Sequence, residues 1–340
     1  MKLIYGSLFG VVVFLGVLLI QSDDNESTHP ERINGVSLVN PHSPIDSLDM
    51  AEITRINASW VAVIPFAFSR PDEPGVYFNH DRQWWGEKLE GCKDLVALAQ
   101  SNGFKIMMKP HVWMRGDWIG EFKLSKEEDW QEWEKQYTEY IMAYAKLSQE
   151  LRVELLCIGT ELKQTILLRP TYWEKLIPEI RKVYHGKLTY ASNWDNYTQV
   201  TFWDQLDYIG VDAYFPLSDV AHPDLDELKI SCKKLKSGLK SYSLTQNKPM
   251  LFAEYGFRSA NGAAGNHWEI TRETTVNMDI QVMTYEAFLS TFWEEEWFAG
   301  GFLWKWHFHP EAGGLDNNDF TPQNKPVEAT IKKWYLNSSL

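Results

Sequence analysis

Two apolar stretches that each end in a glutamate decide the fold: LLCIGTE at residues 155–161 and MLFAE at residues 250–254. Elsewhere, similar β-rich apolar runs alternate with longer helical patterns, which favours a parallel sheet covered by helices. Counting outward from these two stretches gives eight predicted strands, at residues 33–39, 60–65, 104–110, 153–159, 187–192, 206–212, 249–253 and 300–303. Eight strands in a chain of this length are typical of a (β/α)8 barrel, the TIM barrel of the α/β class.

Helical patterns fill most of the links between these strands. The predicted helices cover residues 48–57, 87–102, 127–150, 172–184, 224–243, 271–295 and 327–335, and the link at 193–205 has room for only one helical turn. In the third helix, aromatic residues recur every three or four positions from Trp130 to Tyr144. A helix that covers a barrel needs such an apolar face for packing. We therefore expect this stripe to pack on the barrel and to bind no ligand.

The first 22 residues are separate from the barrel. Lys2 precedes an apolar run at residues 3–20, and a polar linker follows at residues 23–32. This order is typical of an export signal, and the run also reaches the lower limit for a membrane span. We expect an exported protein that is periplasmic, extracellular or, if the segment is not cleaved, held on the membrane by residues 3–20. Residues 33–340 contain no Gly/Ser/Pro linker and are predicted to form a single domain.

Composition narrows the class of ligand. The net charge of -13 and the pI near 5.2 disfavour nucleic acid, which needs clustered Lys and Arg, and a neutral or cationic ligand fits better. The chain has 16 Trp and 15 Tyr, and rings with a polar edge suit surfaces that are part apolar and part wet, as the faces of sugars are. The three cysteines are far apart and form neither a disulfide framework nor a metal pattern. No cofactor is expected.

Polar and aromatic residues stand where the apolar runs stop, and in barrels of this kind the catalytic groups lie at the carboxyl ends of the strands. Glu161 and Glu254 end the fourth and seventh predicted strands, which face each other across the barrel mouth. Either glutamate alone could simply end a strand or pair with a nearby cation, but two beside aromatic residues favour a catalytic pair. Glycoside hydrolysis requires two such carboxyl groups: one gives a proton to the leaving oxygen, and the other attacks the anomeric carbon or activates water.

The sequence around these glutamates resembles the clan A glycoside hydrolases and, within that clan, family 113, a group of β-mannanases. The resemblance rests on GTEL at 159–162, FAEYG at 252–256 and GFLWKW at 301–306. It extends over most of the barrel. It implies that residues 33–340 form a catalytic domain that hydrolyses β-1,4-linked mannan or glucomannan, as polysaccharide or oligosaccharide, by retaining double displacement with endo action.

The resemblance also implies a role for each candidate residue. Glu161 would be the acid/base, Glu254 the nucleophile, and Tyr214 the donor that orients it. Trp304 would form the floor of the subsite for the sugar that is cleaved. Further aromatic platforms and polar contacts to sugar hydroxyls are expected from Trp113, Trp194, Trp306, Lys109, His111, Asn193 and Asp212.

One position departs from much of the clan. Clan members commonly have Asn immediately before the acid/base, where it binds the 2-hydroxyl of the substrate, whereas this chain has Thr160. Members of family 113 also lack that Asn, so the departure agrees with the narrower resemblance. The contact to the 2-hydroxyl is left unassigned.

Other functions stay open at this level. The substrate could be another β-hexoside or xylan, and the action could be exo instead of endo. A non-catalytic carbohydrate-binding barrel would keep the aromatic residues, although it would be expected to lose one glutamate. His307 and His309 resemble the histidine pair of metal-dependent amidohydrolase barrels, but they follow the last strand and no further ligand pattern follows. We expect no metal site. Substrate selection is expected from the long loops at 66–85 and 112–124.

Overall fold

The computed structural model describes residues 32–46, 50–220 and 222–336. The predicted export segment and the linker up to residue 31 lie outside the described residues. Within the described part of the chain, no helix is both long and apolar enough to cross a membrane.

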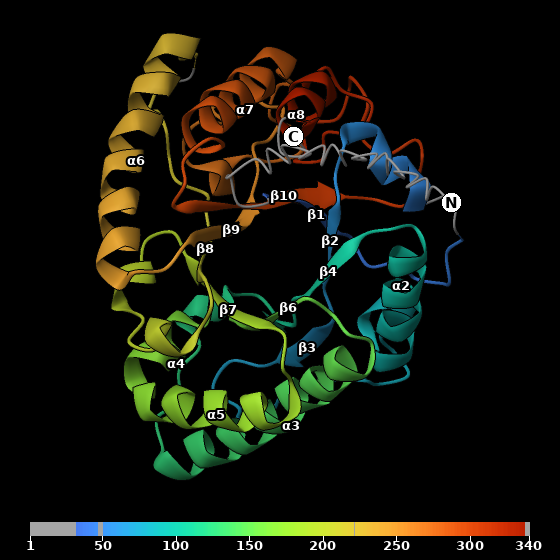
Figure 1. The fold of residues 1–340 in the computed structure, drawn as a ribbon, viewed down its shortest axis with the longest axis vertical. Helices are drawn as coiled ribbons and strands as arrows, with labels where there is room; N and C mark the ends of the chain where they lie inside the picture. The colour runs from blue at the N-terminus through green and yellow to red at the C-terminus, as the bar shows by residue number, and fades with distance from the viewer. Residues whose placement is uncertain (1–31, 47–49, 221, 337–340) are drawn as a thin grey trace, which may run out of the picture.

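Eight parallel strands close into a barrel, which confirms the predicted (β/α)8 fold (Figure 1). The order around the barrel is β1, β10, β9, β8, β7, β6, β4 and β2, and β1 pairs with both β10 and β2. The barrel strands are β1 (Ile33–Leu38), β2 (Trp60–Val63), β4 (Lys105–Met108), β6 (Leu155–Thr160), β7 (Lys187–Asn193), β8 (Ile209–Asp212), β9 (Met250–Tyr255) and β10 (Phe298–Trp306). Each overlaps its predicted range.

Two short strands outside the barrel were not predicted. They are β3 (Phe66–Ser69) and β5 (His111–Met114), which pair in parallel as a separate two-stranded sheet. Each begins soon after a barrel strand, beyond Pro65 or Pro110. Proline has no N–H to continue a ladder of hydrogen bonds, which is consistent with the break between barrel strand and outer strand. The two predicted substrate-selecting loops therefore overlap this small sheet.

Helices surround the barrel, as Figure 1 shows in a view down its axis. They are α2 (Leu89–Ser101), α3 (Glu127–Glu150), α4 (Lys163–Leu168), α5 (Pro170–Val183), α6 (Leu225–Gln246), α7 (Met278–Phe292) and α8 (Val327–Leu336). The short α4 was not predicted, and the link between β7 and β8 contains two 3-10 turns, η4 (Tyr197–Gln199) and η5 (Trp203–Gln205), where one turn was expected. The predicted helix at 48–57 is mainly a 3-10 helix, η1 (Glu52–Ile56), over its described residues.

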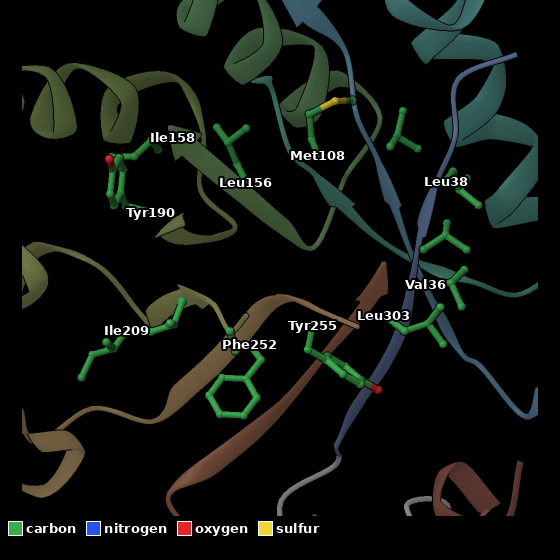
Figure 2. Close-up of a cluster of buried hydrophobic side chains, with 14 of the residues drawn as sticks. Val36, Leu38, Met108, Leu156, Ile158, Tyr190, Ile209, Phe252, Tyr255 and Leu303 are labelled. Atoms are coloured by element: carbon green, nitrogen blue, oxygen red, sulfur yellow. The ribbon is translucent and has the colours of Figure 1, made fainter. Parts of the chain in front are cut away.

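Apolar side chains form two cores on opposite sides of the barrel wall. Met107, Leu155 and Phe302 belong to the inner core. The outer core lies between the barrel and the helices, and Figure 2 shows part of it, including Ile158 and Leu303. Because successive residues of a strand face opposite sides, one strand supplies both cores.

The aromatic stripe of α3 packs on the barrel, as predicted. Its five rings, from Trp130 to Tyr144, are at most 6% exposed. The Tyr137 hydroxyl donates to the carbonyl of Ile158 on β6 at 2.9 Å, and the Tyr140 hydroxyl donates to the carbonyl of His111 on β5 at 2.8 Å. The helix thereby holds two of the strands from which the functional site is built.

Candidate active site

The carboxyl ends of the barrel strands meet at a cavity of about 430 Å³. Glu161 lines it directly after β6, Asp212 at the end of β8, Glu254 on β9 and Trp304 on β10. His111, the first residue of β5, lines it as well. The fold thus brings together the two predicted catalytic glutamates with several of the predicted substrate contacts.

Donors that follow the ends of two other strands, β4 and β8, contact both carboxylate oxygens of Glu254. The Lys109 ammonium donates to Oε1, and the Tyr214 hydroxyl donates to Oε2 at 2.7 Å. Burial and the charge of Glu254 keep the pKa of Tyr214 well above its usual range, so the phenol keeps its proton and donates. His111 Nε2 lies 3.4 Å from Oε1 without hydrogen-bond geometry. Glu254 is therefore fixed in orientation with only 8% of its side chain exposed.

Lys109 lies beneath the cavity floor. Its side chain is fully buried and forms ion pairs with Glu254 and, at 3.1 Å, with Asp212. Burial lowers the pKa of the ammonium, but the two carboxylates more than offset this and raise it, so Lys109 is charged. The predicted contact of Lys109 with a sugar is wrong, because β5 continues outward beyond Pro110 and leaves Lys109 one layer below the mouth. Asp212 is 1% exposed at the cavity wall, and its sugar contact stays a prediction.

Glu161 faces the same cavity with a different set of neighbours. Burial and, to a smaller extent, the charge of Glu254 raise the pKa of the Glu161 carboxyl to about 7. A 2.6 Å hydrogen bond from Trp118 Nε1 to Oε2 of Glu161 lowers this pKa but does not outweigh the two effects that raise it. The backbone of Glu161 lies in the left-handed region, with φ of 53°, at the turn where β6 ends. Non-glycine residues in this region are concentrated at functional sites. Glu161 can therefore hold a proton near neutral pH.

His111 and Trp304 present parallel rings, with 8° between their planes and 6.2 Å between their centroids. Burial and the charge of Lys109 hold the pKa of His111 well below its usual range. The imidazole is therefore neutral and does not supply an acidic proton. Trp304 is partly exposed into the cavity, where its ring can form the floor of a sugar subsite.

The prediction that Trp306 is a substrate platform is wrong. Its ring is fully buried in the outer core, with the Arg55 guanidinium 5.2 Å from the ring centroid. The pairing of β10 with β1 is irregular here, because Trp304 and Trp306 of β10 face successive residues of β1. This irregularity at Lys305 breaks the alternation that would have turned both tryptophans toward the cavity.

The remaining predicted contacts line neighbouring parts of the cleft. Trp113 is 48% exposed at the edge of the catalytic cavity. Asn193 and Trp194 line a second cavity of about 530 Å³, which also includes Glu161 and Glu254. Asn193 Nδ2 donates to Asp195 at 2.8 Å. These positions suit contacts to a bound sugar chain, which stay predictions.

The described residues hold no group of three or more His, Cys, Asp or Glu side chains that could bind a metal. His309 Nδ1 accepts a hydrogen bond from the backbone of Glu311, and the backbone of His307 pairs with Gln323. The two histidines are thus part of a loop network in this structure.

Comparison with known proteins agrees with this geometry. A family model, Glycoside Hydrolase Family 113, matches residues 42–325. This chain belongs to glycoside hydrolase family 113. The match confirms the resemblance drawn from the motifs around Glu161 and Glu254 and shows that the barrel is that of a glycoside hydrolase.

Solved structures of family 113 superpose on the chain. The β-mannanase AaManA from Alicyclobacillus acidocaldarius, in complex with ManMIm, is 25% identical, with a TM-score of 0.80 over 91% of this chain and 98% of that one. Two structures of a family 113 β-1,4-mannanase, one of them a complex, are 26% identical, with TM-scores of 0.76 and 0.75 over 90% of this chain and 99% of theirs. A search of curated protein sequences finds no significant match.

Trp118, His267 and Phe320 are among the residues of this family 113 site that were not predicted from the sequence. All three line the catalytic cavity. Trp118 lies in a loop that was expected to select the substrate, but nothing in its spacing indicated a bond to Glu161. His267 and Phe320 come from long loops after β9 and β10 and pack against the Tyr214 ring. Their ring centroids lie 4.9 Å and 5.9 Å, respectively, from that of Tyr214. Only the fold brings them to the site.

Proposed function

We propose that this glycoside hydrolase is a retaining, endo-acting β-1,4-mannanase that works by double displacement. The observation that carries the proposal is the contrast between two glutamates on one cavity. Glu161 has a pKa raised to about 7 and can give up a proton near neutral pH. Glu254 accepts hydrogen bonds on both oxygens, from Lys109 and Tyr214, and these two donors hold its carboxyl group in one orientation. Glycoside hydrolysis requires a protonated acid and a second carboxyl group on one cavity, and the resemblance to family 113 makes that second group the nucleophile of a retaining reaction.

In the first step, a Glu254 oxygen attacks the anomeric carbon and the bond from that carbon to the glycosidic oxygen breaks. Glu161 transfers its proton to the departing oxygen, which leaves as a hydroxyl group. Lys109 and Tyr214 fix the direction of attack, and such orientation is a large part of enzymatic rate enhancement. Trp304 supports the reacting sugar from below.

In the second step, water replaces Glu254. Forming the glycosyl ester removes the negative charge of Glu254, which is one cause of the raised pKa of Glu161. The pKa of Glu161 then falls, so its carboxylate accepts a proton from water as the water oxygen attacks the anomeric carbon. The bond to Glu254 breaks, and Glu254 departs as a carboxylate. The two attacks together retain the anomeric configuration.

Endo action is supported by cavities on both sides of the catalytic pair. The second cavity, with Asn193 and Trp194, extends the site on one side. On the other side a cavity of about 400 Å³ shares Phe66, Trp113 and Trp304 with the catalytic cavity. A sugar chain that continues in both directions fits such a cleft better than a chain end does.

The choice of mannan is supported by the family 113 structures described as β-mannanases, at 25–26% identity. A substrate panel tests it: β-mannan, glucomannan, xylan, cellulose and their oligosaccharides with the wild type. We expect the fastest release of reducing ends from mannan or glucomannan, with internal cleavage of oligosaccharides. Faster cleavage of xylan or cellulose would contradict the mannanase assignment and leave the barrel hydrolase intact.

The catalytic assignment is tested on the same panel with Glu161→Gln and Glu254→Gln. Both variants keep the size of the side chain and lose its carboxyl chemistry. We expect turnover to fall by about 10³-fold or more for each. Near wild-type turnover in either variant would contradict the proposed roles, and no activity even in the wild type would favour a carbohydrate-binding barrel.

We also propose that the protein is exported, on the basis of the apolar run at residues 3–20. Export would bring the enzyme to a polymer such as mannan, which is too large to cross a membrane intact. Expression of the full chain with a C-terminal tag in a bacterial host, followed by cell fractionation, tests this. Recovery in the medium, periplasm or membrane fraction is expected, and recovery in the cytoplasm would contradict it.

A further inference from the structure

The small sheet of β3 and β5 leads away from the catalytic cavity. In it, Phe66 pairs with His111 and Phe68 pairs with Trp113. Alternate residues of a strand face the same side, so these four residues form two successive rows on one face. The first row lines the catalytic cavity, and the second row lines a cavity of about 820 Å³ next to it. The cavity of about 400 Å³ described above shares residues with both the catalytic cavity and this outer cavity, and it therefore joins them.

Two arginines continue this face of the sheet. Arg70 and Arg115 follow the last residues of β3 and β5 and stand two positions beyond Phe68 and Trp113. Both line the outer cavity. Extended chain advances about 3.3 Å per residue, so Arg70 and Arg115, four positions beyond Phe66 and His111, lie at most roughly 13 Å from that row. The face therefore changes from aromatic to cationic as it leaves the catalytic glutamates.

A third arginine reaches the same cavity from the loop before η2 (Trp85–Glu87). This third residue is Arg82. Neither Arg82 nor Arg115 has a side-chain hydrogen bond or ion pair with any described residue. Arg70 has a 3.5 Å contact with Glu73, with both side chains largely exposed. Exposed ion pairs of that kind contribute little to the stability of the protein. The three guanidinium groups are thus available to a ligand.

Two carboxyl groups line this cavity as well, Asp81 and Glu87. Glu87 is buried, burial raises the pKa of its carboxyl, and it accepts a hydrogen bond from the backbone of Trp84. Among the residues that line the cavity, three guanidinium groups thus stand with two carboxyl groups, one of which is buried.

Large exposed rings surround the arginines. Tyr77 and Trp84 are each 42% exposed and Trp113 is 48% exposed, and all three line the outer cavity. Rings with a polar edge that are left exposed in one cavity are suited to stacking against the faces of sugars. The outer cavity therefore combines platforms for a sugar with cations for a charged substituent.

We propose that the outer end of the cleft binds a negatively charged sugar unit, one that carries a carboxylate or a phosphate ester, through Arg70, Arg82 and Arg115. Guanidinium groups match both anions in geometry. The net charge of -13 favours neutral or cationic ligands overall, so recognition of an anion depends on this local cluster. The inference rests on the proposed function in that the charged unit belongs to the sugar chain that the enzyme cleaves.

Calorimetry on the full chain with Glu161→Gln, which binds without cleaving, tests this site. The probes are three mannan oligosaccharides of equal length: neutral, oxidised at C6 to a carboxylate, and phosphorylated at C6. At low salt we expect at least one acidic probe to bind about tenfold more tightly than the neutral one. The acidic probe that binds more tightly than the neutral one identifies the anion, carboxylate or phosphate, that the site prefers. The gain should shrink in about 0.5 M salt.

Arginine variants in the same background locate the effect. Arg82→Gln and Arg115→Gln should each reduce the acidic-to-neutral ratio about threefold or more, with little change for the neutral probe. Arg152→Gln is the control, because Arg152 is exposed just before β6, at the opposite end of the barrel. Equal binding of all three probes, or an unchanged ratio in both variants, would overturn the inference. Failure of the proposed function would show separately, as no cleavage of mannan by the wild type.

Discussion

The indole Nε1 of Trp118 donates a 2.6 Å hydrogen bond to Oε2 of Glu161. This bond occupies one carboxyl oxygen as an acceptor and leaves Oε1 to carry the acidic proton. It also stabilises the charged form, which lowers the pKa of Glu161 against the larger effects of burial and Glu254. Trp118 therefore acts through Glu161, as a positioning residue for the acid/base.

Trp118→Phe removes the donor and keeps an aromatic ring. The pKa of Glu161 should rise above its value of about 7. Because activity is lost as the acid loses its proton, the alkaline limb of the kcat/KM profile should move to higher pH. We also expect kcat to fall about tenfold, since the acid is less well oriented. Trp113→Phe, which removes no bond to Glu161, should change KM and leave the limb in place. A limb that stays in place in Trp118→Phe would contradict this role.

Glu161 also makes the folded protein sensitive to pH. Its pKa is raised from 4.5 to about 7 by burial, so the folded state binds the proton more tightly than the unfolded state. Stability therefore falls as pH rises from about 4.5 to 7, and the loss is complete above pH 7. Glu161→Gln should raise the free energy of unfolding by up to about 3 kcal/mol at pH 8 and by almost nothing at pH 4. Chemical denaturation at both values measures this, and the same difference at both would contradict it.

The barrel and the catalytic pair could be predicted because each strand is a local apolar run. The strands that carry Glu161 and Glu254 are continuous apolar stretches, and their ends fix the position of the glutamates on the barrel mouth. No long-range information is needed for either step.

The errors come from features that depend on three-dimensional context. Trp306 was misplaced because the irregular pairing at Lys305 changes which side the residue faces. Lys109 was misplaced because β5 extends the wall beyond the predicted end of the strand. Trp118 was missed because its bond to Glu161 joins residues 43 positions apart, in a loop without a periodic pattern.

The two tryptophans of β10 should respond differently to truncation. Trp306→Ala removes a fully buried ring and should cost about 3–5 kcal/mol of stability, with little effect on KM at a temperature where the protein stays folded. Trp304→Ala removes a partly exposed cavity wall and should weaken substrate binding and turnover with a smaller loss of stability. Thermal unfolding and steady-state kinetics separate the two. A larger kinetic defect in Trp306→Ala than in Trp304→Ala would restore the original prediction for Trp306.

Lys109 should matter for both folding and catalysis. Lys109→Met leaves the buried carboxylates of Asp212 and Glu254 without their shared cation, which should cost about 3 kcal/mol or more. Turnover should also fall, because Glu254 loses one of the two donors that orient it. Lys146→Met on the exposed face of α3 is the matched control and should stay within about 0.5 kcal/mol of the wild type. Equal stability of the two variants would contradict the role of Lys109.

The central claim is that Glu254 forms a covalent bond to the sugar while Glu161 supplies and recovers the proton. The most direct measurement uses a 2-deoxy-2-fluoro mannosyl fluoride, which slows the second step, followed by mass spectrometry of the intact chain and of its peptides. We predict one added fluoromannosyl group on the peptide that contains Glu254 and none in Glu254→Gln. A label on another residue, or hydrolysis with inversion of the anomeric configuration and no label in the wild type, would contradict the account.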